Sequence, residues 1–136
     1  MRYLALDLGA RRTGLAVGDT ASGIISPLPQ VEAGTDAARL EAVASAVREQ
    51  GAASVVLGLP LSMGGTSGPA SAAVRAFGAR LASVTGVEVA YQDERLTSFA
   101  ADQQMARSGR TRGQKKKIRD SLAAAAILRD YFDVVA

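Results

Sequence analysis

The segment YLALDLGARRTGLAVGD, residues 3–19, decides the fold class of this chain. Two runs of alternating apolar residues flank a turn at Gly9–Arg12, which predicts an antiparallel pair of strands over residues 2–8 and 13–19. Asp7 ends the first of these strands among leucines, on the same side as the tyrosine and the alanine. A carboxylate in that position is unexpected, and it points to chemistry at the end of the strand.

The second strand presents one face with almost no side chains. Gly14, Ala16 and Gly18 alternate along it, so another element can approach this face closely. Further along the chain, the pattern predicts an edge strand, a helix, a buried strand, a helix, a strand and two helices. These elements lie at about residues 24–31, 36–50, 54–60, 69–84, 87–94, 97–108 and 116–132. The stripe of the second helix contains Val74, Phe77, Leu81 and Val84.

This order of elements predicts the fold class. The first three strands can form an antiparallel meander, and the later strand–helix units require parallel crossovers. We therefore expect one α/β domain over residues 1–136 of the ribonuclease-H-like type, a mixed five-stranded sheet flanked by helices. A doubly wound nucleotide-binding fold would place a helix directly after the first strand.

The composition excludes several kinds of active site. The 136 residues contain neither Cys nor His, so thiolate nucleophiles, Ser-His-Asp triads and His-ligated metals are ruled out. Any acid–base or metal chemistry must use Asp and Glu, which favours hard, oxygen-preferring ions. No apolar run is long enough to span a bilayer, and no signal peptide is evident, so we expect a cytoplasmic protein without a membrane partner.

Positive charge is concentrated in one segment. Residues 95–119 hold eight of the 16 basic residues and a single acid, which makes this segment +7 in a chain of net charge +3. Such a segment suggests a polyanionic partner, RNA or DNA, although a solvated basic surface is the simpler alternative. With the two arginines of the first turn, the candidate nucleic-acid-binding residues are Arg11, Arg12, Arg95, Arg110, Arg112, Lys115, Lys116 and Lys117.

Three acids occupy positions that favour metal binding. Asp7 and Glu94 end strands, and Asp120 shares one side of the last helix with Ala124 and Ile127. Clustered carboxylates raise one another's pKa, and a divalent cation removes that repulsion. Two cations held by carboxylates are common machinery for phosphodiester hydrolysis. Each acid also has a simpler interpretation, as a turn cap, a surface residue or a helix-terminus acid.

Four motifs in order resemble the YqgF/RuvX family of Holliday-junction-resolvase-like and pre-16S rRNA processing nucleases. They are ALDLGARRTGLAVGD, VVLGLPLSMGGTSG, YQDERLTS and KKKIRDSLAAAAILRDYF. The resemblance implies a ribonuclease-H-like fold related to RuvC, with Asp7, Glu94 and Asp120 as catalytic metal ligands. It also implies an Mg²⁺- or Mn²⁺-dependent nuclease, with two metals, that acts on the 5′ end of pre-16S rRNA or on branched DNA.

One departure and two alternatives accompany this resemblance. RuvC-type resolvases carry a further carboxylate in the last helix, whereas Ser, Leu and alanines follow Asp120 here, which favours simple strand cleavage over junction resolution. A nucleic-acid-binding module of the same fold with little catalysis is the first alternative. The second is an actin-like ATPase, whose two-lobed fold requires a much longer chain. The patterns leave monomer and homodimer equally open.

Overall fold

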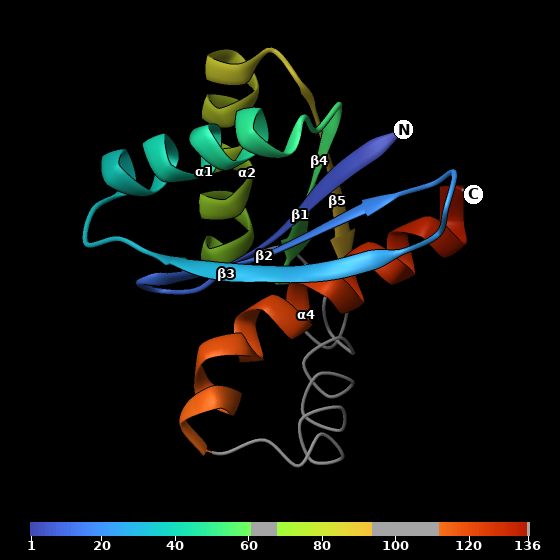
Figure 1. The fold of residues 1–136 in the computed structure, drawn as a ribbon. Coiled ribbons are helices and arrows are strands. Elements are labelled where there is room, and N and C mark those ends of the chain that lie inside the picture. Colours follow the sequence, from blue (N-terminus) through green and yellow to red (C-terminus); the bar gives the residue numbers. More distant parts are fainter. Residues whose placement is uncertain (61–67, 94–111, 136) are drawn as a thin grey trace.

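The chain folds into a mixed five-stranded sheet with helices on both faces (Figure 1). The structure is a computed structural model that describes residues 1–60, 68–93 and 112–135, with the backbone alone over 112–120. Its strands are β1 (Arg2–Leu8), β2 (Arg12–Asp19), β3 (Ile25–Glu32), β4 (Ser54–Leu59) and β5 (Glu88–Asp93). Its helices are α1 (Asp36–Gln50), α2 (Pro69–Thr85) and α4 (Arg112–Val135).

The order of strands across the sheet is β3-β2-β1-β4-β5. The pairs β1–β2 and β2–β3 are antiparallel, whereas β1–β4 and β4–β5 are parallel. This confirms the predicted mixed sheet, and it confirms that the proline-containing strand β3 lies at an edge. The central strand is β1, so the acid at its end lies in the middle of the sheet.

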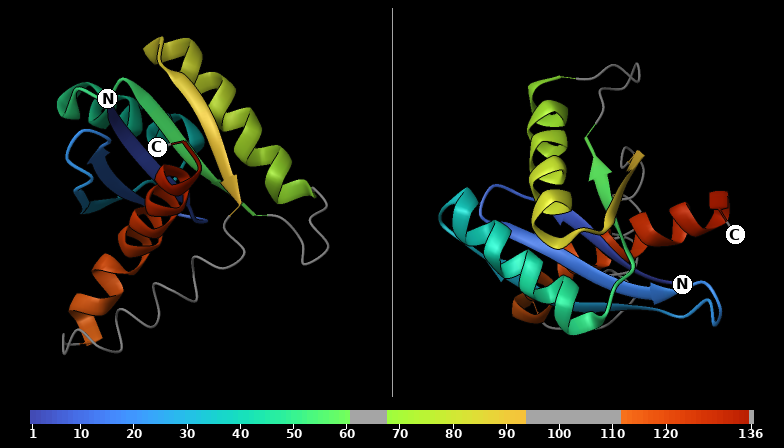
Figure 2. Two further views of the ribbon diagram at one scale, coloured as in Figure 1. Left: turned by 90° about the vertical axis from the view of Figure 1, so that its right-hand side faces the viewer. Right: turned by 90° about the horizontal axis from the view of Figure 1, so that it is seen from above.

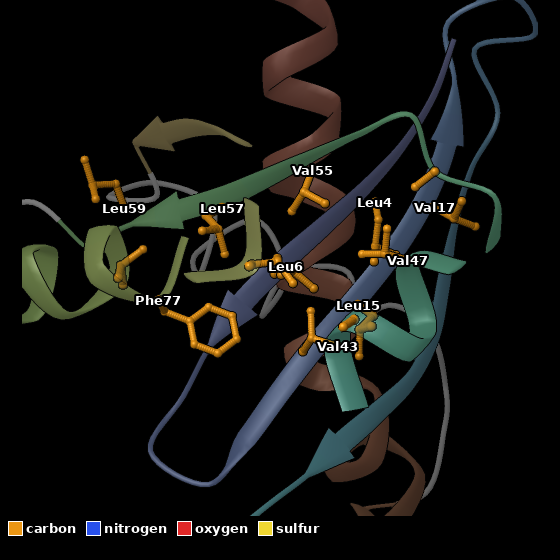
Figure 3. Close-up of a cluster of buried hydrophobic side chains, with 14 residues drawn as sticks. Leu4, Leu6, Leu15, Val17, Val43, Val47, Val55, Leu57, Leu59 and Phe77 are labelled. Atoms are coloured by element: carbon orange, nitrogen blue, oxygen red, sulfur yellow. The ribbon is translucent and has the colours of Figure 1, made fainter. Parts of the chain in front are cut away.

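One face of the sheet packs against α1 and α2 (Figures 1 and 2). Leu4, Leu6 and Leu15 point to this side and are at most 2% exposed. They meet Val43 of α1 and Phe77 of α2, as Figure 3 shows. The strict alternation in β1 and β2 produces this core, because every second residue of a strand faces the same side.

The opposite face packs against α4 (Figure 1). Ala5 and Ala16 of the sheet meet Ala124 and Leu128 of the helix. A Cβ atom added to Gly18 would lie 3.0 Å from Cδ2 of Leu128, so a side chain at this position would crowd that leucine. The prediction that small residues on β2 admit a closely packed element is therefore confirmed, and the element is α4.

Local signals set the ends of the first two helices. The Thr35 hydroxyl caps α1 by accepting a hydrogen bond from the Ala38 amide at 3.1 Å, and Gly51 ends that helix with φ +62°. Pro69 begins α2, where its missing amide hydrogen has no cost. Val84 does not belong to the buried stripe of α2, since it is 56% exposed near the end of the helix.

The last helix begins earlier than expected. The sequence predicts a helix from about residue 116 after a polar, mobile segment, but α4 already begins at Arg112. Gln, Lys and Arg are good helix formers and no proline interrupts them, so the helix extends to Arg112 without an apolar stripe there. The lysines Lys115–Lys117 therefore lie in its first two turns. The helix expected over 97–108 lies outside the described residues.

None of the helices in the described parts of the chain is long and apolar enough to cross a membrane. The longest, α4, begins with the basic stretch RGQKKKIR. The first turns of α4 project away from the sheet, whereas its later turns cross underneath it (Figures 1 and 2).

Candidate active site

Asp7 lies at the carboxyl end of the central strand, one residue before β1 ends. It is half-buried and pairs across the sheet with Gly14 of β2. The alternation of β1 places it on the side of Tyr3 and Ala5, which pack in the core beneath α4. A rigid strand thus presents this carboxylate on the face that α4 covers.

Glycines flank Asp7 on both neighbouring strands. Leu6 pairs with Leu57 of β4, so Asp7 is level with the next residue, Gly58. Gly58 in turn pairs with Gln92 of β5. With Gly14 on one side and Gly58 on the other, neither adjoining strand carries a side chain at this level. Backbone without a side chain therefore flanks Asp7 on both neighbouring strands.

The structure describes no side chain for the other two predicted ligands. Glu94 lies outside the described residues, directly after Asp93, the last residue of β5, and two positions after Gln92. Asp120 lies within α4, one helical turn before the fully buried Ala124. Among the side chains that the structure describes, no three acids gather closely enough to hold a metal ion. The acidic triad thus stays a prediction.

The predicted basic contacts divide into three sets. In the β1–β2 turn, Arg11 is exposed, whereas the Arg12 Nε lies 3.8 Å from Glu32 Oε1 in an exposed ion pair that contributes little stability. Arg95 and Arg110 lie outside the described residues. The remaining basic residues, Arg112 and Lys115–Lys117, belong to the projecting start of α4.

Arg39 is a buried residue near the site that the sequence analysis missed. Its side chain is 8% exposed, and its Nη2 donates hydrogen bonds to the carbonyl oxygens of Gly9 and Ala10 at 2.6 and 2.7 Å. These bonds connect α1 to the turn that follows Asp7. The signal was present, because Arg39 precedes Val43 by one helical turn and so lies on the apolar stripe of α1.

Nearly the whole chain matches one protein family and relatives that bear the name of a nuclease. Residues 1–134 match the family model described as "RuvX: Holliday junction resolvase". A protein of Chloroflexus aggregans named "Putative pre-16S rRNA nuclease" is 41% identical over 96% of this chain and 92% of its own length. A protein of the same name from Lactococcus lactis is 38% identical over 99% of this chain and 96% of its own length.

Solved structures show the same fold. RuvC of T. thermophilus in complex with a Holliday junction substrate aligns with a TM-score of 0.62 at 14% identity, over 99% of this chain and 96% of that chain. The fowlpox virus resolvase in complex with Holliday junction DNA aligns with a TM-score of 0.64 at 13% identity, over 99% of both chains. The fold is therefore that of RuvC-type resolvases. The family match and the relatives together show that this chain belongs to the RuvX family of nucleases.

Proposed function

We propose that this nuclease depends on Mg²⁺ or Mn²⁺, held as two ions by Asp7, Glu94 and Asp120, and that it processes the 5′ end of pre-16S rRNA in the cytoplasm. The names of the relatives support this choice of substrate. The family description and the structures with Holliday junction DNA support branched DNA as a second substrate.

The placement of Asp7 carries the proposal. Its carboxylate ends the central strand, between glycines on both neighbouring strands and on the face that α4 covers. β5 lies two strands from β1 in the sheet, and Glu94 is the next residue in the chain after its last residue, Asp93. Two ions held by carboxylates about 3.5–4 Å apart are common machinery for phosphodiester hydrolysis. The donor set fits, because carboxylate oxygens are the protein ligands that Mg²⁺ and Mn²⁺ prefer.

Bound divalent cations would supply an activated water and neutralise charge on the phosphate and the leaving oxygen. The chain's own residues supply position. The strand holds Asp7 rigidly, and Arg39 fixes the turn that follows it. That turn displays Arg11 to solvent, where its guanidinium can pair with a backbone phosphate on either side of the cleaved bond.

The direct test is cleavage by the purified protein. We expect Mn²⁺ or Mg²⁺ to activate cleavage of labelled RNA carrying the 5′ extension of 16S rRNA, and EDTA to abolish it. Single-stranded DNA and a four-way junction are the parallel substrates. Faster cleavage of the junction would replace the RNA assignment, and absence of metal-activated cleavage on all three substrates would overturn the proposed function.

The projecting start of α4 should act as a phosphate contact. Changing Lys115, Lys116 and Lys117 together to Ala should weaken binding of RNA and DNA about equally, because phosphate contacts carry no sequence information. The log–log salt dependence of binding should flatten by roughly one unit for each lost contact.

The control is Arg48→Ala with Arg75→Ala, which removes basic residues from the two helices on the opposite face of the sheet. Binding titrations of a labelled oligonucleotide at several salt concentrations measure both slopes. An unchanged salt dependence in the triple variant would show that these lysines are solvated and do not contact phosphates.

A further inference from the structure

Ser121 is a buried polar residue that none of the proposed chemistry uses. It follows Asp120 directly in α4 and is 0% exposed. Its hydroxyl donates a hydrogen bond to the Leu28 carbonyl oxygen at 2.5 Å and accepts one from the Leu15 amide at 3.4 Å. A side chain of the helix therefore hydrogen-bonds to the backbones of two neighbouring strands.

The two strands are irregular at this point. Thr13 pairs with Val31, and Leu15 pairs with Leu28, so two steps along β2 match three steps along β3. Such a bulge disturbs the regular hydrogen-bond ladder of the strands. The Ser121 hydroxyl bridges the amide and the carbonyl of the Leu15–Leu28 pair at the edge of this bulge. The buried hydroxyl of the helix thus hydrogen-bonds to backbone groups of both strands next to the bulge.

This contact lies beside the candidate site. Leu15 is the neighbour of Gly14, and Gly14 is the cross-strand partner of Asp7. Ser121 therefore hydrogen-bonds to the residue next to the cross-strand partner of Asp7. In the chain, Ser121 directly follows Asp120.

The other described contacts of α4 with the sheet are made by apolar and aromatic side chains. Ala124 and Ala125 pack on Ala5 and Ala16, Leu128 lies close to Gly18, and Tyr131 and Phe132 meet Tyr3 edge to face. Hydrogen bonds are directional, and they weaken steeply when the angle at the hydrogen falls. The two bonds of Ser121 are therefore suited to set the rotation and the depth of α4 on the sheet.

We propose that Ser121 is a positioning residue of the metal site, which sets α4 on β2 and β3 so that the helix backbone at Asp120 is held at a fixed position relative to Asp7. The inference rests on the proposed function, because it requires Asp120 to be a metal ligand. Residues that orient metal ligands typically change metal affinity or activity by 10–100-fold when they are replaced.

The test compares Ser121→Ala with Ser54→Ala. Ser54 is also buried, 4% exposed, and its hydroxyl also donates to a backbone carbonyl, that of Glu88 at 3.2 Å. It lies at the start of β4, at the end of the sheet opposite to Asp7. Ser121→Ala loses two hydrogen bonds to strand backbones and Ser54→Ala loses one, and only Ser121 lies beside the candidate site.

We expect Ser121→Ala to weaken Mn²⁺ binding about tenfold in calorimetry, and to raise the Mn²⁺ concentration for half-maximal cleavage by the same factor. The KM for the nucleic acid should change less than the metal dependence, because Ser121→Ala removes none of the basic side chains that are predicted to contact phosphates. Ser54→Ala should match the wild type in all three quantities. A merely structural role would lower the folded fraction without moving the metal dependence.

The outcomes separate the two proposals. If the wild type binds no Mn²⁺ and cleaves nothing, the proposed function fails. If the wild type binds and cleaves while Ser121→Ala keeps the metal affinity of Ser54→Ala, the role of Ser121 is overturned and the proposed function stands. Amide hydrogen exchange of Leu15 provides a further readout, since it should accelerate in Ser121→Ala and stay slow in Ser54→Ala.

Discussion

Asp7→Asn should abolish metal-dependent cleavage while leaving nucleic-acid binding close to that of the wild type. Asp7 lies at the carboxyl end of the central strand, so both ions of a two-metal site would depend on it. Losing about 4 kcal/mol of charge stabilisation corresponds to a rate decrease of roughly a thousandfold. Single-turnover cleavage of labelled RNA in Mn²⁺ measures the rate, and titration in EDTA measures binding.

Asp19→Asn is the matched control for this variant. Asp19 also ends a strand, β2, but at the opposite end of the sheet, where its carboxylate accepts a hydrogen bond from the Ala21 amide. That hydrogen bond and the terminal ammonium group lower the pKa of Asp19, so its carboxylate is charged at neutral pH. We expect Asp19→Asn to cleave at the wild-type rate.

The Asp7→Asn variant also separates the nuclease from a catalytically inactive binding module of the same fold. A binding module would keep both its affinity and its function in the variant. The melting temperature of the wild type should rise with Mn²⁺ because the folded state alone binds the ion, and Asp7→Asn should lose most of that increase. Wild-type cleavage by Asp7→Asn would show that the site is elsewhere.

Asp120→Asn should cause the second large loss, again on the order of a thousandfold in rate if this residue is the third ligand. The backbone places it one turn before Ala124, at the point where α4 reaches the sheet. In metal-free buffer the variant should be as stable as the wild type or slightly more stable, because it removes one of several like charges. Chemical denaturation measures the stability of the variant, and single-turnover cleavage measures its rate.

Asp130→Asn provides the control on the same helix. Desolvation and the neighbouring Asp133 raise the pKa of Asp130, so the fold favours its protonated form and its charge costs some stability above that pKa. Removing the charge should therefore leave cleavage unchanged and slightly increase stability at neutral pH. If Asp120→Asn cleaves like Asp130→Asn, then Asp120 is an ordinary helix acid and the third ligand must be sought elsewhere.

The sequence alone determined the order of elements, the mixed sheet and the two faces of β1. Strand alternation, the Thr35 cap, Gly51 and Pro69 are local signals, and local signals can be recognised in the sequence without knowledge of the fold. The same signals located Asp7 at the end of the first strand, and the structure showed that this strand is the central one. The sequence analysis did not predict that α4 begins at Arg112. The first residues of this helix favour helix formation, but they lack the apolar stripe by which a helix is recognised in a sequence.

The tertiary structure alone decided how the site is held in place. Arg39 bonds to a turn about 30 residues earlier, and Ser121 bonds to strands 93 and 106 residues away in the chain. Each appears in the sequence as a polar residue on an apolar stripe, and its partners are backbone groups that every residue possesses. Backbone groups leave no pattern in the sequence, so only the folded arrangement identifies which carbonyl a buried side chain satisfies.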